Sequence, residues 1–163
     1  MSKRGIRFLA HGAIVAALYV VLTYLTNLLG LAFGPVQFRL SEALCVLPCV
    51  MPAAAPGVFV GCLVSNLLSP YGLLDLVVGS LATLFAALTT LRIRRRALVP
   101  LPTILFNAVM VGAMIAYYET AGGSGAFFAA FLYNAATVGL GEAVVTYALG
   151  LPLLKWLPKS LYE

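Results

Sequence analysis

The stretch from Phe33 to Leu44, FGPVQFRLSEAL, concentrates side chains that can bind a ligand. It holds Arg39 and Glu42 together with Gln37 and Ser41, between two apolar segments. The chain has only ten basic and five acidic residues, so two charges in one short connection need an explanation. A connection that only joined two helices would need neither. We therefore expect this stretch to fold into a pocket and to contact a bound molecule.

Glu142 is the second residue whose type and position point to chemistry. It ends the motif Val138-Gly-Leu-Gly-Glu142, in the middle of a long apolar run. A carboxylate at the centre of a bilayer costs about 2.5–3.5 kcal/mol on insertion scales, so it persists where it faces a cavity or a partner. A structural partner such as Arg39 or an asparagine is one explanation, and contact with a ligand is the one that we favour.

Amide side chains inside apolar runs extend this polar set. Each amide offers two donors and an acceptor, so it can bind a ligand or simply join two helices through a hydrogen bond worth about 0.6 kcal/mol. In so apolar a chain, their occurrence together with Glu142 favours a shared polar pocket. The amides are Asn66, Asn107 and Asn134.

Three further candidates have structural explanations beside the functional one. Tyr71 could stack on a flat ligand, but tyrosines near a membrane surface often anchor a helix there. Asp75 follows a turn at residues 69–72 and could simply occupy the first turn of a helix, where the helix dipole favours a negative charge. Ser41 could cap a helix whose first turn holds Glu42, although that would leave Arg39 unexplained.

The sequence predicts neither an enzyme nor a metal or cofactor site. Cys45, Cys49 and Cys62 lie in apolar runs, and with His11 as the single histidine a zinc site is poorly supported. We expect the cysteines to be small buried residues. No serine or cysteine is placed with a histidine, and the glycines at 122–125 form a flexible connector rather than a phosphate loop.

The composition identifies the bilayer as the solvent of this protein. The chain is 63% hydrophobic and 9% charged, with a mean hydropathy of +1.04, whereas soluble domains carry about 25% charged residues. At about 20 residues per span, this length allows at most six helices. We therefore predict an all-α, multi-pass protein of the cell membrane, with residues 1–163 in a single membrane domain. The first apolar run, 8–31, is too long for a cleavable signal.

Topology, rather than nucleic-acid binding, explains the net charge of +5. Nine of the ten basic residues fall at 3–7, 92–96 and 155–159, and the positive-inside rule places these segments and both termini in the cytoplasm. Arg39 is the exception. The outer or intramembrane charges are Arg39, Glu42, Asp75, Glu119 and Glu142. One positive and four negative groups favour a cation or a ligand rich in hydrogen-bond donors.

Parity decides how the apolar runs divide into helices. If residues 43–68 formed one span, the basic segment 92–96 would face the opposite side from the N-terminus, so we expect a division at Pro52 to Pro56. The six predicted helices are Phe8 to Leu31, Glu42 to Met51, Pro56 to Leu68, Leu73 to Leu91, Pro100 to Tyr118, and Phe127 to Leu154, the last with or without a break at 150–152. Gly57 and Gly61 give the third helix a face for close packing.

Several motifs occurring in order resemble the QueT family, the queuosine-precursor substrate-binding (S) components of energy-coupling factor (ECF) transporters. The motifs are Gln37-Phe-Arg-Leu-Ser-Glu-Ala-Leu44, Pro52-Ala-Ala-Ala-Pro-Gly57, Gly61-Cys-Leu-Val-Ser-Asn66, Ser69-Pro-Tyr-Gly-Leu-Leu-Asp75, Gly79-Ser-Leu-Ala-Thr83 and Gly139-Leu-Gly-Glu142. The resemblance covers nearly the whole chain and is weakest from Glu119 to Phe131.

The resemblance implies a mechanism of uptake. A six-helix S component captures a vitamin-like solute from outside, docks on a transmembrane coupling (T) component attached to two ATPases, and is thought to topple in the membrane to release the solute. An Ala-xxx-Ala motif on the first helix forms the docking face in such proteins, and Ala13 and Ala17 match it. The first outer loop closes over the ligand in the wider class.

The implied ligand is a 7-deazaguanine: queuine, its aminomethyl-deazaguanine precursor, or queuosine. A carboxylate can accept the adjacent N–H donors of a guanine-like edge in parallel. We assign Glu142 to this edge and Glu42 to a cationic amine or to gating, with the reverse also open. The polar contacts would be completed by Asn66, Asn107 and Asn134. Arg39 and Gln37 would hold the outer loop closed over the ligand.

Three other functions compete with this interpretation. A solitary carrier or facilitator could use intramembrane carboxylates for proton relay. An intramembrane enzyme has no supporting catalytic motif here. A purely structural subunit would leave Glu142 and the asparagines costly without a purpose.

Overall fold

The structure is a computed structural model that describes residues 2–121 and 125–157, and every regular element in these ranges is helical. Most of the glycine connector expected at 122–125 lies outside the described residues, as does Lys159. The all-α prediction is therefore confirmed.

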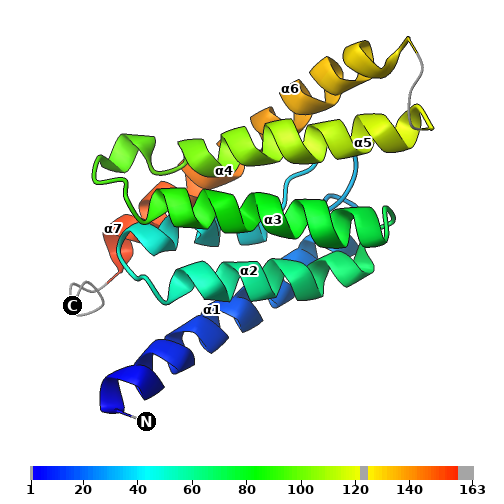
Figure 1. The fold of residues 1–163 in the computed structure, drawn as a ribbon. Coiled ribbons are helices and arrows are strands. Elements are labelled where there is room, and N and C mark those ends of the chain that lie inside the picture. Colours follow the sequence, from blue (N-terminus) through cyan, green and yellow to red (C-terminus); the bar gives the residue numbers. More distant parts are fainter. Residues whose placement is uncertain (1, 122–124, 158–163) are drawn as a thin grey trace.

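The described residues make six helical passes, in agreement with the prediction (Figure 1). The first three passes are α1 (Lys3–Leu28), η1 (Leu40–Cys49), and α2 (Ala54–Ser65) extended by η2 (Asn66–Leu68). The fourth is α3 (Leu73–Thr90), which is followed by the short turn η3 (Arg96–Leu98). The fifth joins α4 (Leu101–Phe106), η4 (Asn107–Val111) and α5 (Gly112–Glu119), and the sixth joins α6 (Phe127–Val145), η5 (Thr146–Gly150) and α7 (Leu151–Trp156).

Four of these passes are long and apolar enough to cross a membrane, and two are shorter apolar helices. The long ones are Lys3–Leu28, Leu73–Thr90, Arg96–Glu119 and Phe127–Trp156. The last runs for 30 residues without the break that we considered at 150–152. Instead, η5 widens into a π-helical turn just before Pro152, which lets the helix continue into α7.

The second pass, η1, is a ten-residue 3-10 helix with Pro48 inside it. Residues 41–48 are all buried, so the protein rather than lipid surrounds this backbone. A 3-10 helix rises about 2.0 Å per residue, which gives about 20 Å against a hydrocarbon core of about 30 Å. The division of 43–68 into two passes is confirmed. The proposed cap is wrong, because Arg39 holds the cap position and the Ser41 hydroxyl instead accepts a hydrogen bond from Thr23.

Small residues let α1 and α2 approach closely. A Cβ added at Gly61 would lie 2.6 Å from the Tyr19 Cβ, and one added at Gly57 would lie 2.6 Å from the Gly12 carbonyl oxygen. The predicted packing face at Gly57 and Gly61 is therefore present, and it packs on α1. This contact holds Tyr19 in the interior, where it is fully buried.

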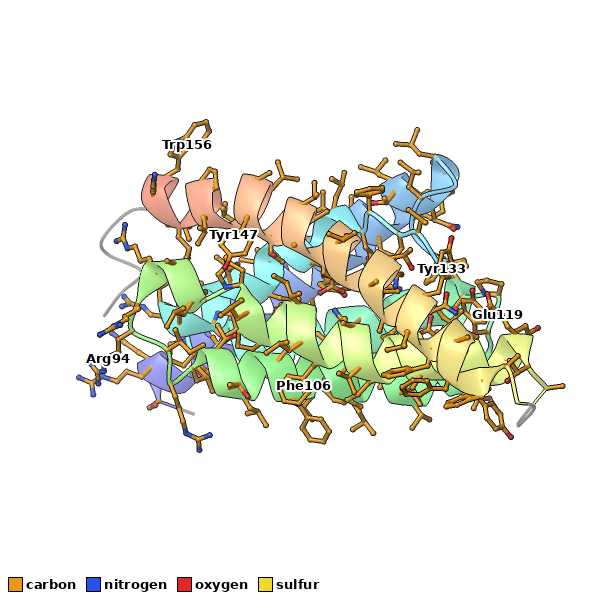
Figure 2. The ribbon with its side chains drawn as sticks, turned by 90° about the horizontal axis from the view of Figure 1, so that it is seen from above. Arg94, Phe106, Glu119, Tyr133, Tyr147 and Trp156 are labelled. Atoms are coloured by element: carbon orange, nitrogen blue, oxygen red, sulfur yellow. The ribbon has the colours of Figure 1, made fainter. Side chains whose placement is uncertain are left out.

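The charged residues divide between the two ends of the bundle. The beginning of α1, the loop between α3 and α4, and α7 all lie at one end (Figure 1). Figure 2 shows Arg94 and Trp156 at this end and Glu119 and Tyr133 at the other. The end with Arg94 carries all described basic residues except Arg39, so the positive-inside rule places it in the cytoplasm.

Candidate functional site

Arg39 lies at the centre of a group of buried polar side chains. It is 6% exposed, and its guanidinium donates to Gln37 Oε1 and to the Ala32 carbonyl, both at 3.2 Å. Nη1 is also 3.4 Å from Asn66 Oδ1 and 3.8 Å from Glu42 Oε1. The last two distances are longer than a good charge-assisted hydrogen bond. Arg39 is therefore held mainly by its own loop and only loosely by Asn66 and Glu42.

Glu42 is a buried carboxylate whose two oxygens both have partners. The Tyr19 hydroxyl of α1 donates to Oε1, and the Cys45 thiol donates to Oε2 at 3.1 Å. Glu42 is 1% exposed and lies in the first turn of η1. Hydrogen bonds from Tyr19 and Cys45, with Arg39 nearby, therefore hold this carboxylate in place when no ligand is bound.

Asn66 links Arg39 to Asp75. The Asn66 amide nitrogen donates to the Asp75 backbone carbonyl at 2.9 Å, which directs its oxygen toward Arg39. The Asp75 carboxylate is buried, and its Oδ1 has no hydrogen-bond partner among the described residues. Gly79 makes room for it, because a Cβ at Gly79 would collide with this oxygen. Asp75 is therefore a buried acceptor with unused capacity.

Glu142 projects from α6 into the same interior. It is 4% exposed, and its Oε2 has no hydrogen-bond partner within residues 2–121 and 125–157. Asn107 is its side-chain hydrogen-bonding neighbour, and Arg39 and Glu42 are near enough to interact with it electrostatically. A buried carboxylate oxygen without a donor costs free energy, and a ligand with N–H groups would satisfy it.

The loop of residues 31–39, called here the 31–39 loop, covers this group of side chains. Its ends are joined by the Phe38 amide, which donates to the Leu31 carbonyl at 2.9 Å. Its backbone packs against α6 at Gly141, where any Cβ would collide with the Gln37 carbonyl. The loop is thus closed against the residue next to Glu142.

Two residues of the 31–39 loop give it its shape. Gly34 has φ +126°, a conformation that other residues rarely adopt. Phe33 places its ring 4.9 Å from the Arg39 guanidinium carbon, which is a cation–π contact. The loop therefore both supplies Arg39 and holds it in position.

The buried charges do not balance. Three carboxylates, Glu42, Asp75 and Glu142, are buried with Arg39 as the sole buried cation among residues 2–121 and 125–157. Two of the carboxylates each have an oxygen without a partner. Such a set can accept N–H groups or a cation, and it disfavours an anion.

The structure places two predicted site residues elsewhere. Asn134 donates to Glu119 Oε2 at 2.8 Å and to the Ala130 carbonyl, and it lies eight positions, or about 12 Å along the helix, before Glu142. Tyr71 packs edge-on against Tyr118 with 5.1 Å between centroids, and burial together with Glu119 raises its pKa above the ordinary value. Both residues belong to the outer end of the bundle, and within the described part of the chain neither has a hydrogen bond to Arg39. Asp75, however, is close enough to Tyr71 to contribute to the rise of its pKa.

Sequence reasoning missed several residues that contact the site. Tyr19 donates to Glu42, Thr23 donates to Ser41, and Thr26 accepts from the Leu40 amide. Their spacing of four and three residues puts them on one face of α1, and this polar stripe in an apolar helix was the available signal. Cys45 and Cys62 are buried as expected, but Cys49, at the end of η1, is only half-buried. The Cys45 thiol also donates a hydrogen bond to Glu42.

A family model described as "QueT transporter" matches residues 9–159. The protein named "Queuosine precursor transporter QueT" of Lactococcus lactis subsp. cremoris (strain MG1363) is 43% identical over 72 residues, which is 44% of this chain and 42% of that relative's length. No solved structure matches the chain. Because the family model spans most of the sequence, this multi-pass membrane protein belongs to the QueT transporter family, whose members are transporters and not enzymes.

Proposed function

We propose that this protein is the substrate-binding component of an ECF importer and that it captures a queuosine precursor of the 7-deazaguanine class. The observation that carries the proposal is the unpartnered oxygen of Glu142, buried beside Asn107 and covered by the 31–39 loop. The name of the Lactococcus relative supports the choice of ligand.

The chemistry of a 7-deazaguanine matches the buried acceptors. Its guanine-like edge carries adjacent N–H donors that one carboxylate can accept together. We assign this edge to Glu142 and a cationic amine to Glu42, with Asn66, Asn107 and Arg39 available to the carbonyl. Besides Glu142 Oε2, the Oδ1 atom of Asp75 also lacks a partner among the described residues, and it lies next to Asn66. This supports a ligand that reaches from Glu142 on α6 to Asp75 on α3.

The weak contacts of Arg39 support a route for entry. At 3.4 Å from Asn66 and 3.8 Å from Glu42, Arg39 holds neither acceptor tightly, and each of these oxygens can accept a better donor on a further lone pair. A ligand that replaces the guanidinium at these groups would push Arg39 outward with the 31–39 loop. The same loop would then close over the bound ligand.

The outer face of α1 supports docking on a coupling protein. Ala13 and Ala17 are both exposed. An apolar groove of about 230 Å³ lies between α1 and α2, and Ala13, but not Ala17, lines it. Its lining includes Gly12, Ala13, Ala16, Gly57 and Val60. Small residues allow another helix to approach closely in lipid, so we assign this groove to the T component, which two ATPases would drive.

Thermal unfolding of the purified protein tests the ligand. We expect aminomethyl-deazaguanine, queuine or queuosine to stabilise it, and guanine to do so weakly. A ligand that binds only the folded state adds about 2.7 kcal/mol at 100 times its Kd. A folded protein that none of these compounds stabilises would contradict the ligand assignment.

Uptake into proteoliposomes tests the mode of transport. The ECF proposal predicts no uptake by this protein alone and uptake when the T component and ATPases are supplied with ATP. Uptake by the protein alone would favour a solitary secondary carrier or facilitator, which the buried carboxylates would also suit.

A further inference from the structure

A separate cavity of about 620 Å³ lies at the basic end of the molecule, where η1 finishes. This volume is in the range of small-molecule sites. Its walls come from the end of η1, the end of α3 with its following loop, and α7. Glu42 lies at the opposite end of η1, so this cavity is distinct from the Arg39 group.

The cavity exists because η1 is short. Its 3-10 backbone of ten residues falls about 10 Å short of the hydrocarbon thickness. Cys49 and Val50, at the end of η1, form part of the cavity lining. The space left beyond this end therefore lies at the basic end of the bundle, beside the loop that carries Arg92, Arg94 and Arg96.

Three arginines line the cavity: Arg92, Arg94 and Arg96. All three are exposed, and none of their guanidinium groups has a hydrogen bond or ion pair within the described residues. No acidic side chain is among the lining residues. Arg95, in the same loop, is not part of the lining. Among residues 2–121 and 125–157, these guanidinium groups are therefore not neutralised, and their N–H donors fit phosphate oxygens.

The rest of the lining is apolar. Val99 and Leu154 are 1% and 2% exposed, so they belong to the packed interior as well as to the cavity wall. Trp156 is 87% exposed at the same end (Figure 2), and exposed tryptophans favour the headgroup region of a membrane. A ligand for this site would carry a phosphate next to an apolar chain.

We propose that this cavity binds an anionic phospholipid of the cytoplasmic leaflet, with the headgroup phosphate on Arg92, Arg94 and Arg96. Basic pockets between helices on the cytoplasmic side bind anionic headgroups, and such lipids are already present at this depth. The lipid fills the space below η1 and closes the bundle at the end opposite the 31–39 loop.

Native mass spectrometry of the full-length protein in a neutral detergent tests this proposal. The probes are dioctanoyl-phosphatidylglycerol, dioctanoyl-phosphatidylcholine and inorganic phosphate. We expect phosphatidylglycerol to bind at least about tenfold more tightly than phosphatidylcholine, and inorganic phosphate in equimolar amount not to displace it. Equal binding of the two lipids would overturn the proposal, and displacement by inorganic phosphate would identify a free-phosphate site instead.

Two triple variants of equal charge separate the cavity from the basic surface around it. We expect R92Q/R94Q/R96Q to weaken phosphatidylglycerol binding at least about tenfold, while R4Q/R7Q/R95Q, at the same end but outside the cavity lining, binds as the wild type does. Helical content and elution volume confirm folding. Equal losses in both triples would show a diffuse electrostatic effect and no built site. A cavity triple that keeps lipid binding but loses its coupling proteins would assign the arginines to a protein interface.

Discussion

Glu42 and Glu142 are both buried, but their surroundings differ. Glu42 receives hydrogen bonds from Tyr19 and Cys45, whereas Glu142 leaves Oε2 without a donor. A bound ligand gains most from the acceptor that the protein has not satisfied. Glu142 is therefore the residue on which affinity should depend most.

The substitution Glu142→Gln is expected to weaken binding of the deazaguanine ligand by about tenfold to a hundredfold, because a hydrogen bond to a charged group contributes about 1.5–3 kcal/mol. The amide keeps the size of the side chain but loses the charge and turns one acceptor into a donor. Isothermal titration of wild type and variant measures the change.

Glu119→Gln is the matched control for this substitution. Glu119 is exposed at the outer end of the bundle, where it accepts a hydrogen bond from the Asn134 amide. We expect the affinity of the Glu119→Gln variant for the deazaguanine ligand to match that of the wild type. Unchanged affinity in Glu142→Gln, with ligand binding otherwise demonstrated, would remove Glu142 from the site.

The substitution Tyr19→Phe removes the hydroxyl that donates to Glu42 Oε1 and is expected to lower the stability of the protein. Leaving a buried acceptor without its donor costs about 1–3 kcal/mol. Thermal unfolding in detergent measures this loss. Tyr24→Phe is the control, because Tyr24 is 50% exposed on the same helix. Equal melting temperatures for the two variants would show that the hydroxyl bond to Glu42 contributes nothing.

The sequence predicted which residue types form the site, because burying a charged side chain in a bilayer costs free energy. Arg39, Glu42 and Glu142 are rare charges in apolar surroundings, and the structure brings them together with Asn66 and Asn107. Asn134 has the same signature, but Glu119 already satisfies its amide nitrogen. Cost in the membrane shows that a polar group needs a partner, and it does not identify which partner.

At the scale of elements, closure of the 31–39 loop against α6 depends on Gly141. In Gly141→Ala the added methyl group would collide with the Gln37 carbonyl, so the loop would be held away from Glu142. We expect faster ligand dissociation and a higher Kd, measured by stopped-flow fluorescence or by ligand exchange.

Gly139→Ala, on the same helix, is the control for a general effect of alanine. Its added Cβ would lie 3.3 Å from the Ala108 Cβ, a side-chain contact that a small shift relieves, and it does not reach the loop. If both variants released ligand at the same rate, contact of the loop with Gly141 would not be needed for closure.

The sequence predicted the number and order of the elements but not their helix types. Proline positions and charge parity were sufficient to divide 43–68 into two passes. They did not reveal the 3-10 geometry of η1 or the π-helical turns η4 and η5, because the apolar residues there show no period that separates these helices from α. Both π-helical turns lie beside the site. Asn107 is the first residue of η4, and Thr146, the first residue of η5, donates a hydrogen bond from its hydroxyl to the Glu142 carbonyl.

At the scale of the whole molecule, orientation in the membrane can be measured directly. In a background with Cys49 replaced by serine, a cysteine at Arg95 should react with an impermeant maleimide only after the cells are opened. A cysteine at Ala121, exposed at the other end, should react on intact cells. The reverse pattern would place the basic end outside and would contradict capture of a solute at the 31–39 loop.

Helix α1 separates lipid from the polar interior. Ala13 and Ala17 point outward, and two residues later Tyr19 points inward and binds Glu42. A rigid helix cannot turn at one face without turning at the other. Any protein that binds at Ala13 and Ala17 and rotates α1 therefore also moves the Tyr19 hydroxyl away from the Glu42 carboxylate. By thermodynamic reciprocity, if binding of that protein changes the affinity of Glu42 for a ligand, the ligand changes the affinity of α1 for the protein by the same factor.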